Sequence, residues 1–404
     1  MGRFDDRSTV VVVGAALAGL RAVEELRAAG FAGRLVMVGA ESHLPYDRPP
    51  LSKQVLAGEW EAEQTALRHL PYDDLDVDWR LGHRAAALDV EGRSVTLTDG
   101  EVIGFEGAVL ATGAVPRTLP GTPPLAGIHV LRTLDESLAL RAELEHDPRV
   151  VVVGAGFIGA EVAATCRGRG LSVTVLEALP SPMVRGLGPM LGDVLGALHR
   201  DHGVDLRLGV GVAGFEGRDR IERVLLGDGA TVDADVVVVG IGVRPATDWL
   251  EGSGLTLEDG VCCDETCVAA PGVVAAGDLA RWPNPRFDGE SMRLEHWTNA
   301  AEQGVFVARR LLLDDPTPFD PVPFVWSDQY DVKIQVAGRV RGDDRIEVVD
   351  GSLADRRFVA AVGRDGRLVG AVAFNRPRQL MTLRRLIADR TGFDDAVGAA
   401  RSLA

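Results

Sequence analysis

The chain has 404 residues, more than one hydrophobic core usually serves, so we expect two or three domains. Hydrophobic residues make up 46% and charged residues 25%, a balance that excludes a disordered or collagen-like chain. The formal net charge of −16 would repel a phosphate backbone or an anionic bilayer, so neither nucleic acid nor a membrane is an expected partner.

The compartment follows from what the sequence lacks. No apolar run approaches the roughly 18 residues of a membrane span, and the first residues, MGRFDDRSTV, do not follow the plan of a signal peptide. We therefore expect a cytoplasmic protein. The cysteines, Cys166, Cys262, Cys263 and Cys267, are too few and too clustered for a disulfide framework. The last three lack a matching fourth ligand, so no metal site is expected.

An internal repeat organises the first part of the chain. VVVVGAALAG at residues 10–19 returns as VVVVGAGFIG at residues 150–159. Each copy opens with a β-branched run typical of a strand buried on both faces of a parallel sheet. Glycines then precede a helical pattern, and a second strand follows at 34–39 and at 171–177. Both copies predict a βαβ unit.

The remaining patterns extend these two sheets and add a third part. Apolar runs at 108–113, 235–242 and 272–278 could each return to one of the sheets. After the Pro-rich boundary at 314–324, strands and then a helix at 377–390 predict a small α+β domain.

The second glycine loop carries the stronger dinucleotide signal. Gly154 permits the tight turn, Gly156 lets backbone approach a pyrophosphate, and Gly159 allows close helix packing. Glu177, 23 residues after Gly154, ends the next strand, where a carboxylate can accept from both ribose hydroxyls. A 2′-phosphate would be repelled there, and no arginine follows before Arg185, so NADH is favoured over NADPH.

The first loop departs from this pattern. Gly14 and Gly19 are kept, but Ala16 puts a methyl group where backbone should meet phosphate, so FAD binding needs some adjustment. Glu41 is the candidate ribose acceptor, although Ala40 occupies a place where an acid could stand. Two dinucleotide units usually serve two dinucleotides, and FAD with NADH is an electron-transfer pair that uses both.

Five further segments give a specific resemblance: LPYDRPPLSK (44–53), ATGAVPR (111–117), GIGVRP (240–245), AAGD (275–278) and EHWTNAAEQG (295–304). With them the chain resembles the bacterial NADH-dependent ferredoxin reductases of the glutathione-reductase-like fold, the putidaredoxin and rhodocoxin reductase type. Such reductases serve cytochrome P450 and aromatic-ring dioxygenase systems. The likeness covers essentially all 404 residues, including the tail WSDQYDVKIQVAG.

The resemblance implies an α/β chain with two Rossmann-like dinucleotide-binding domains and a C-terminal α+β domain. FAD would bind residues 1–113 with 242–325, and NADH the inserted domain, 114–241. The C-terminal domain, 326–404, would cover the flavin and help to dock the ferredoxin. A monomer or weak dimer is expected.

The resemblance also assigns site residues. Arg48 and Lys53 would approach the flavin and its phosphates, with Lys53 near the reactive ring edge, where a cation stabilises the reduced ring. Arg132 would contact FAD, Asp278 would bind its ribityl chain, and Trp297 would border the isoalloxazine ring.

The other assigned residues surround the same ring and the nicotinamide. Trp326 would lie near the opposite rim of the flavin, Glu161 would point toward nicotinamide and flavin, and Phe157 would be the gate over the flavin. The remaining cofactor-binding positions in the matched motifs are Thr112, Ile158, Gly242 and His296.

The segment equivalent to residues 41–53 holds neither the cysteine pair of the disulfide reductases nor the single cysteine of the flavin peroxidases. Reduced FAD must therefore pass its electrons to an external acceptor, and an acidic [2Fe–2S] ferredoxin is expected. Residues 326–404 hold 14 Lys and Arg against 11 Asp and Glu, and this net charge of +3 offers a docking face.

Three alternatives remain open. A rubredoxin reductase or a quinone-reducing diaphorase shares the fold and also lacks the cysteine pair. Only acceptor assays separate these enzymes from a ferredoxin reductase. An apoptosis-inducing-factor-like redox-signalling flavoprotein usually carries targeting or basic DNA-binding segments, which are missing here. A non-catalytic dinucleotide sensor predicts the loss of Lys53 or the flavin-edge residues, which are present.

Overall fold

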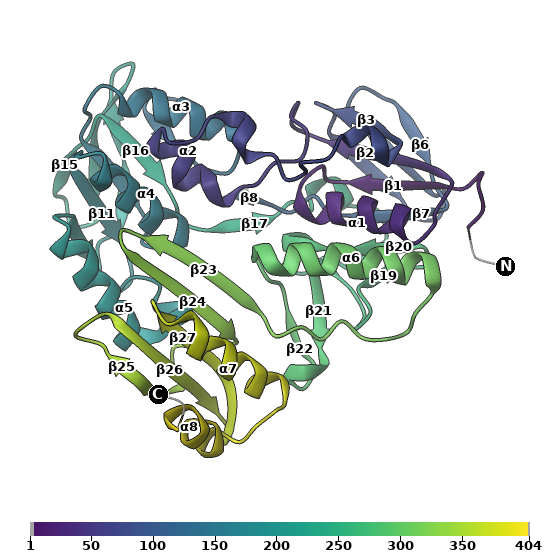
Figure 1. The fold of residues 1–404 in the computed structure, drawn as a ribbon. Helices are drawn as coiled ribbons and strands as arrows, with labels where there is room; N and C mark the ends of the chain where they lie inside the picture. The colour runs from purple at the N-terminus through teal and green to yellow at the C-terminus, as the bar shows by residue number, and fades with distance from the viewer. Residues whose placement is uncertain (1–3, 403–404) are drawn as a thin grey trace. The chain divides into compact units, whose positions relative to one another are not determined.

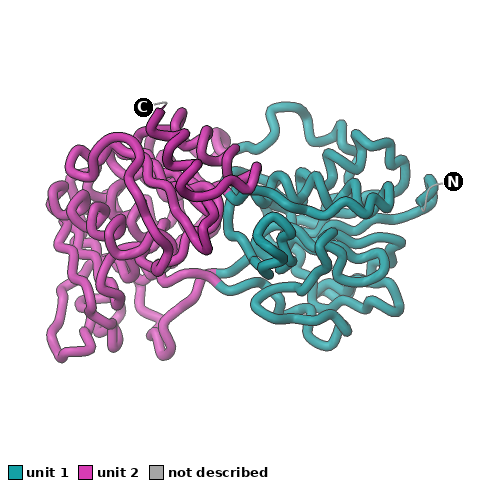
Figure 2. Tube along the Cα trace, turned by 90° about the horizontal axis from the view of Figure 1, so that it is seen from below, with its two compact units in different colours: residues 1–47, 66–115, 244–323 teal, residues 48–65, 116–243, 324–404 magenta. Residues whose placement is uncertain are grey.

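The computed structural model describes residues 4–402, and at Arg185 the backbone alone. The chain folds into two compact units, each assembled from three segments and shown in separate colours in Figure 2. Unit 1 combines the chain up to Asp47 with Ala66–Val115 and Arg244–Pro323. Unit 2 combines Arg48–Thr65 and Pro116–Val243 with the chain from Phe324 onward.

A six-stranded sheet in the order β19-β20-β7-β1-β2-β3 is the frame of unit 1 (Figure 1). Every pairing in it is parallel except the one between β19 and β20. The strands are β1 (Thr9–Val13), β2 (Arg34–Gly39), β3 (Val77–Leu81), β7 (Gly107–Leu110), β19 (Val268–Ala270) and β20 (Val273–Ala275).

The central strand of this sheet is buried on both faces, as its β-branched run predicted. Val10 and Val12 join a core with residues of α1 (Leu17–Ala28) and α6 (Trp297–Leu313). Val11 and Val13 face a second core, shared with the antiparallel sheet of β4 (Ala85–Asp89), β5 (Ser94–Leu97) and β6 (Val102–Gly104).

Helices α1 and α6 lie side by side in Figure 1 because a glycine lets them approach. A Cβ at Gly304 of α6 would lie 2.3 Å from the carbonyl oxygen of Ala18 in α1. This contact accounts for the last glycine of the EHWTNAAEQG segment. Unit 1 also contains the short strands β18 (Val261–Cys262), β21 (Ala280–Asn284) and β22 (Glu290–Met292), which form one sheet. The two-stranded sheet of β8 (Ala114–Pro116) and β17 (Val243–Pro245) is formed where the chain passes from one unit into the other.

Unit 2 repeats the parallel architecture with a five-stranded sheet in the order β12-β11-β10-β16-β9. The strands are β9 (Ile128–His129), β10 (Val150–Val153), β11 (Val173–Glu177), β12 (Asp205–Leu208) and β16 (Val236–Val239). The helices are α2 (Gln54–Ala57), α3 (Leu134–Leu144), α4 (Phe157–Gly168) and α5 (Val184–Asp201), the last kinked at Gly188. A core on one face joins the sheet to β13 (Val212–Gly217), β14 (Ile221–Leu226) and β15 (Thr231–Asp233).

The C-terminal part of unit 2 is an antiparallel five-stranded sheet with helices on both faces. Its order is β23-β24-β27-β26-β25. One face shares a core with α5, where Leu191 and Leu195 join Phe358 and Val362. On the other face the Phe393 ring leaves no room for a Cβ at Gly363. The elements are β23 (Phe324–Gln329), β24 (Val332–Gly338), β25 (Arg345–Ser352), β26 (Arg357–Arg364), β27 (Arg367–Phe374), α7 (Pro377–Ala388) and α8 (Phe393–Arg401).

The predicted α/β fold with a C-terminal α+β domain is confirmed. Two elements of the C-terminal domain were not predicted. Strand β26 and helix α8 had no sequence prediction, since β26 reads RFVAAVGR and alanine and glycine have low strand propensity. The run at 325–338 is two strands, because the chain turns at Tyr330, whose φ is +56°.

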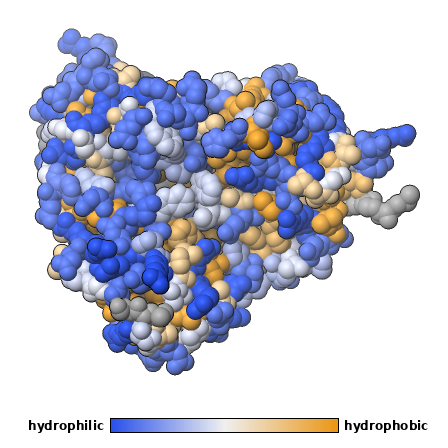
Figure 3. Space-filling view, in the orientation of Figure 1, coloured by the Kyte–Doolittle hydropathy of each residue, from blue (hydrophilic) through white to orange (hydrophobic). Residues whose placement is uncertain are grey.

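Hydrophilic side chains cover most of the face seen in Figure 3, with hydrophobic ones between them. Among residues 4–402, no helix is both long and apolar enough to cross a membrane.

Candidate functional site

The two glycine loops share one stereochemistry at their first glycine. Gly14 has a φ of +123°, and a Cβ there would lie 2.1 Å from the carbonyl oxygen of Ala111. Gly154 has a φ of +99°, and a Cβ there would lie 2.4 Å from the carbonyl oxygen of Gly240. In each loop a neighbouring strand end therefore excludes every residue but glycine.

The third glycine of each loop is also constrained in the same way. A Cβ at Gly19 would lie 2.1 Å from the carbonyl oxygen of Gly14, and a Cβ at Gly159 would lie 2.1 Å from that of Gly154. The helix can start directly above the turn only because these positions carry no side chain. The sequence repeat is thus a repeat of loop geometry.

The middle position of each loop lies at the N-terminus of a helix. A Cβ at Gly156 would meet no atom within 4 Å, and Gly156 starts α4 without a side-chain cap. Ala16 starts α1 in extended conformation, again without a side-chain cap, and is half-buried. Helix N-termini with backbone N–H groups of this kind bind phosphate. Both loops therefore suit a dinucleotide, and at the three glycine positions they differ only in the methyl group of Ala16.

Glu177 stands at the rim of the second loop. Its Oε2 accepts a hydrogen bond of 2.7 Å from the Ala155 backbone N–H, and its Oε1 accepts one of 2.9 Å from that of Leu179. A carboxylate offers about four acceptor positions, so this half-buried group keeps capacity for ribose hydroxyls. Its fixed negative charge disfavours a 2′-phosphate.

Glu41 has a different place in the first loop. Val13 pairs with Val38 as Val153 pairs with Leu176, so the position equivalent to Glu177 is Gly39. A Cβ at Gly39 would lie 2.6 Å from the Cβ of Ala15, which excludes a side chain there. Glu41 follows two residues later, and its Oε2 accepts a 2.5 Å hydrogen bond from the Tyr46 hydroxyl. Ala40 between them is exposed.

Asp278 lies just beyond β20, at the sheet edge where β1 leads into Gly14 and β7 leads toward Thr112. Ligands of open parallel sheets bind at this carboxyl edge. The turn is held by Gln303 of α6, whose Oε1 accepts from the Gly277 N–H at 2.9 Å. Thr112 donates to the Ala246 carbonyl oxygen at 3.0 Å and accepts from Trp249 at 3.4 Å.

Trp297 and His296 begin helix α6 in the same unit. The indole N–H of Trp297 donates to Asp47 Oδ1 at 2.7 Å, which fixes the ring. His296 is the half-buried N-cap residue of the helix.

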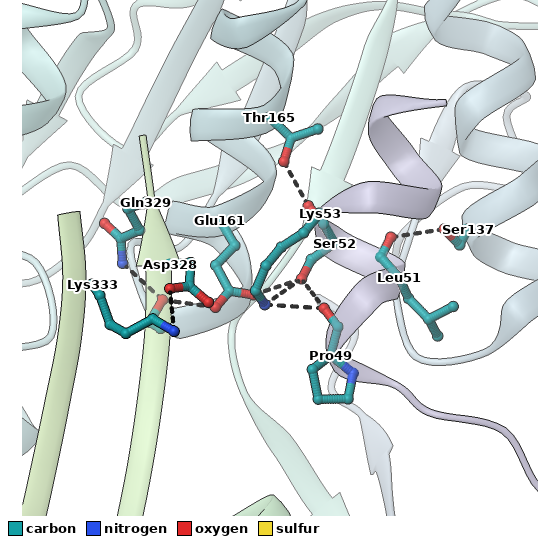
Figure 4. A network of polar contacts seen from close by, with 11 residues as sticks. Pro49, Leu51, Ser52, Lys53, Ser137, Glu161, Thr165, Asp328, Gln329 and Lys333 are labelled. Carbon is teal, nitrogen blue, oxygen red and sulfur yellow. Dashed lines mark hydrogen bonds and ion pairs between the residues drawn. The ribbon is translucent and has the colours of Figure 1, made fainter. Parts of the chain in front are cut away.

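Unit 2 contains a buried ion pair between two of the predicted site residues (Figure 4). Lys53 Nζ lies 2.6 Å from Glu161 Oε2, and the two side chains are 13% and 4% exposed. Ser52 donates to the same oxygen at 2.5 Å, and Ser327 donates to Oε1 at 2.7 Å. A buried carboxylate is stable as an anion when it is paired and hydrogen-bonded in this way.

Hydroxyl groups on two helices hold the segment that carries Lys53. Ser137 of α3 donates to the Leu51 carbonyl oxygen at 2.7 Å, and Thr165 of α4 donates to that of Ser52 at 2.7 Å. Lys53 Nζ also donates to the Pro49 carbonyl oxygen at 3.0 Å. Lys53 is therefore held at both ends: its backbone segment by Ser137 and Thr165, and its ammonium by Glu161 and Pro49 (Figure 4).

The other predicted residues of unit 2 lie around this pair or in its connecting loops. The Arg48 guanidinium donates to the Arg132 carbonyl oxygen. Phe157 and Ile158 form the first turn of α4, and Ile158 is 44% exposed. Two positions lie further along the chain: Gly242, with a φ of +94°, and half-buried Trp326 on β23.

Four buried polar residues that lie near Glu161 or are linked to it were not predicted from the sequence: Ser52, Ser327, Gln329 and His199. A signal for two of them was present. Side chains alternate between the two faces of a strand, so Ser327 and Gln329 in WSDQ share the face opposite Trp326.

The cysteines are free thiols. Burial raises the pKa of Cys166 and of Cys267 to about 12, and raises that of Cys263 well above its usual range. These three are therefore protonated and poor nucleophiles at neutral pH. Within the described part of the chain, no group of three or more His, Cys, Asp or Glu could hold a metal ion.

Comparison with known proteins agrees with this geometry. The model of the pyridine nucleotide-disulphide oxidoreductase family matches residues 8–304, and the reductase C-terminal model matches residues 324–403. The chain is 38% identical to rhodocoxin reductase of Rhodococcus erythropolis over 94% of this chain and 89% of that protein. It is 37% identical to the ferredoxin reductase component of chlorobenzene dioxygenase of Cupriavidus sp. (strain PS12) over 96% and 94%.

A solved structure supports the same assignment. The reductase in the covalent putidaredoxin reductase–putidaredoxin complex superposes with a TM-score of 0.92 at 33% identity, covering 98% of this chain and 96% of that one. The duplicated loop geometry, the two matched models and these relatives together show that the chain belongs to the pyridine nucleotide-disulphide oxidoreductase family.

Proposed function

We propose that this protein is an FAD-dependent reductase that takes hydride from NADH and passes single electrons to a [2Fe–2S] ferredoxin feeding a cytochrome P450 or an aromatic-ring dioxygenase. The observation that carries the proposal is the presence of two dinucleotide loops with one stereochemistry in a chain that holds no cysteine in residues 41–53. Bound FAD supplies the exchange between one two-electron donor and two one-electron acceptors.

FAD binding is the role of residues 1–113 and 242–325. The α1 N-terminus after Ala16 takes the pyrophosphate, Glu41 is the ribose acceptor, and Asp278 binds the ribityl chain. Three features support this arrangement: the strict glycine at position 14, the open sheet edge beside Asp278, and the fixed Trp297 ring. Arg48, Thr112, Arg132 and His296 complete the expected FAD contacts.

NADH binding is the role of residues 114–241. The loop at Gly154–Gly159 takes the pyrophosphate, and the Glu177 carboxylate accepts from the adenosine ribose. Support comes from the two backbone N–H groups that already orient this carboxylate. Phe157 is the gate over the flavin, and Ile158 and Gly242 are further cofactor contacts.

The Lys53–Glu161 pair serves the hydride step. The buried carboxylate fixes the position of the Lys53 ammonium, and a fixed cation stabilises negative charge that develops in the acceptor ring. Because the ammonium is already oriented, little reorganisation is needed when that charge appears.

The electrons leave to an external acceptor, and Trp326 on β23 is the proposed exit residue. The C-terminal domain, 326–404, offers basic residues for an acidic partner. Arg378 and Arg385 project from the exposed side of α7, where the described residues form no ion pair with either. Charge complementarity of this kind speeds the encounter of transient redox partners and weakens with salt. Free thiols fit a cytoplasmic location.

Acceptor specificity tests the proposal. The purified flavoprotein is assayed with NADH and, in turn, a [2Fe–2S] ferredoxin with cytochrome c, rubredoxin, and a quinone. Ferredoxin-dependent cytochrome c reduction that exceeds both other rates is the expected result. Faster rubredoxin or quinone reduction would overturn the assignment of the partner.

A further inference from the structure

A line of buried polar side chains leads away from Glu161 toward helix α5. Ser327 and Gln329 of β23 are 0% exposed, and His199 of α5 is 2% exposed. Gln329 Nε2 lies 3.2 Å from Ser327 Oγ, His199 Nε2 lies 3.1 Å from Gln329 Oε1, and the Tyr330 hydroxyl lies 2.9 Å from His199 Nδ1. None of these groups has a role in the function proposed above.

The carboxylate sets the direction of every hydrogen bond in this line. Glu161 Oε1 can only accept, so Ser327 donates its one proton to it and must itself accept from Gln329. Gln329 therefore turns its amide nitrogen toward Ser327 and its oxygen toward His199. A histidine that meets an amide oxygen through Nε2 must carry its proton there.

The far end of the line agrees with this direction. Burial lowers the pKa of His199 to about 4, so the ring is neutral and its Nδ1 is free to accept from the Tyr330 hydroxyl. The phenol is held by His202, whose ring stacks on that of Tyr330 at 3.7 Å between centroids. All four donors thus point toward Glu161.

The line matters because the two oxygens of the Glu161 carboxylate accept different numbers of hydrogen bonds. Oε2 accepts from Ser52 and Lys53, whereas the hydrogen bonds of the described residues give Oε1 a single donor, Ser327. Without that hydroxyl, Oε1 would be buried without a partner, and the carboxylate could rotate away from Lys53.

We propose that Ser327, Gln329, His199 and Tyr330 form a one-way hydrogen-bond line that positions Glu161, and through it the Lys53 ammonium, for hydride transfer. The four are positioning residues, and their role rests on the proposed function. The line joins three buried groups on β23 and α5 to Tyr330 in the turn after β23. It has one satisfied arrangement, so it orients Ser327 more firmly than an isolated hydroxyl would be oriented.

The first test follows flavin reduction by NADH in single-turnover stopped flow, together with the flavin midpoint potential. Ser327→Ala should slow reduction about tenfold or more and shift the potential, because a hydrogen bond to a charged group is lost. Ser327→Thr, which keeps the hydroxyl, should stay within about threefold of the unmodified protein. Ser8→Ala is the matched control, since Ser8 also donates to a carboxylate, Asp5 Oδ1, but lies outside the line.

A coupling measurement separates positioning from a general structural effect. In a Glu161→Gln background, Ser327→Ala should change the rate by about threefold or less, because there is no longer a charge to orient. An equal loss in both backgrounds, or a rate and potential unchanged by Ser327→Ala alone, would overturn the proposal. Gln329→Met should give a smaller loss in the same direction, and it too should vanish beside Glu161→Gln.

The second test measures the tautomer of His199 in the resting protein, without turnover. Nitrogen-15 NMR of His199 should show the Nε2–H tautomer, with no protonation of the ring down to about pH 5.5. In Gln329→Met the tautomer should change to a mixture. An Nδ1–H tautomer in the unmodified protein would refute the line. Absence of flavin or of NADH oxidation would instead refute the proposed function, whereas the His199 tautomer reports on the line in either case.

Discussion

Replacing Lys53 by methionine should destabilise unit 2, because the Glu161 carboxylate would remain buried without its cation. The two side chains are 13% and 4% exposed and their charged atoms lie 2.6 Å apart. Removing one partner of such a pair costs about 3–5 kcal/mol. Ser52 and Ser327 continue to donate to the carboxylate, so we expect a loss near the lower end, about 3 kcal/mol.

The assay is thermal and denaturant unfolding of the holoenzyme as a double-mutant cycle with Glu161→Gln. For a cooperative unit of this size a loss of about 3 kcal/mol lowers Tm by about 6–12 °C. The neutral amide of Glu161→Gln needs no cation, so the double variant should recover about 2 kcal/mol relative to the sum of the single changes.

Lys333→Met is the matched control. Lys333 lies 3.4 Å from Asp328, but these side chains are 50% and 37% exposed, and exposed pairs contribute about 0–1 kcal/mol. A Lys53→Met variant as stable as Lys333→Met would contradict the assignment of a buried pair. Normal reductase turnover in Lys53→Met would contradict its part in the hydride step.

Four further predictions concern the loops, the histidine and the docking face. Gly156→Ala should raise the KM for NADH about tenfold at unchanged Tm, because the added methyl group meets no protein atom but occupies the space before the helix; an unchanged KM would count against the pyrophosphate site. Glu177→Gln should reduce the preference for NADH over NADPH, measured as the ratio of kcat/KM values, and an unaltered ratio would refute the role of the charge. The pKa of His199 is lowered to about 4 from 6.5, so the unfolded chain binds more protons between these values and stability falls as pH falls. Denaturant unfolding should show a loss of about 2 kcal/mol between about pH 7.5 and about pH 5 that is absent in His199→Phe. Arg385→Glu should slow ferredoxin reduction at low salt and leave NADH oxidation by a small-molecule acceptor unchanged, and equal loss with both acceptors would argue against docking on α7.

The two βαβ units could be predicted from sequence because their signals are local. A β-branched run, a glycine turn and a helical pattern lie within about 30 residues, and each has its own physical cause. The glycine requirement at Gly14 also follows from the motif, but its partner, the carbonyl oxygen of Ala111, comes from a strand almost 100 residues away. The close approach itself is therefore visible only in the fold.

Glu41 was proposed as the ribose acceptor from the sequence, but the steric reason for its place in the chain could not be predicted. The repeat suggested an acid near the end of β2, and the register places Gly39 where Glu177 stands in the second unit. A side chain at Gly39 would collide with Ala15. Glu41 follows two residues later, and its contact with Tyr46 depends on how the following loop folds.

The partners of Glu161 show the general limit. The resemblance picked out Lys53 and Glu161 separately, but the ion pair between them joins positions 108 residues apart. Ser327 lies a further 166 residues along the chain from Glu161. Strand alternation in β23 indicates that Ser327 and Gln329 face inward, yet which buried charge they serve is decided by tertiary packing.

Anaerobic titration of the purified yellow holoenzyme with NADH, followed by mixing with an oxidised [2Fe–2S] ferredoxin, tests the central proposal most directly. The account predicts that about one NADH bleaches the flavin absorbance and that each reduced flavin then reduces about two ferredoxins. A preparation that stays colourless after reconstitution with FAD, or a flavin that NADH does not bleach, would contradict it.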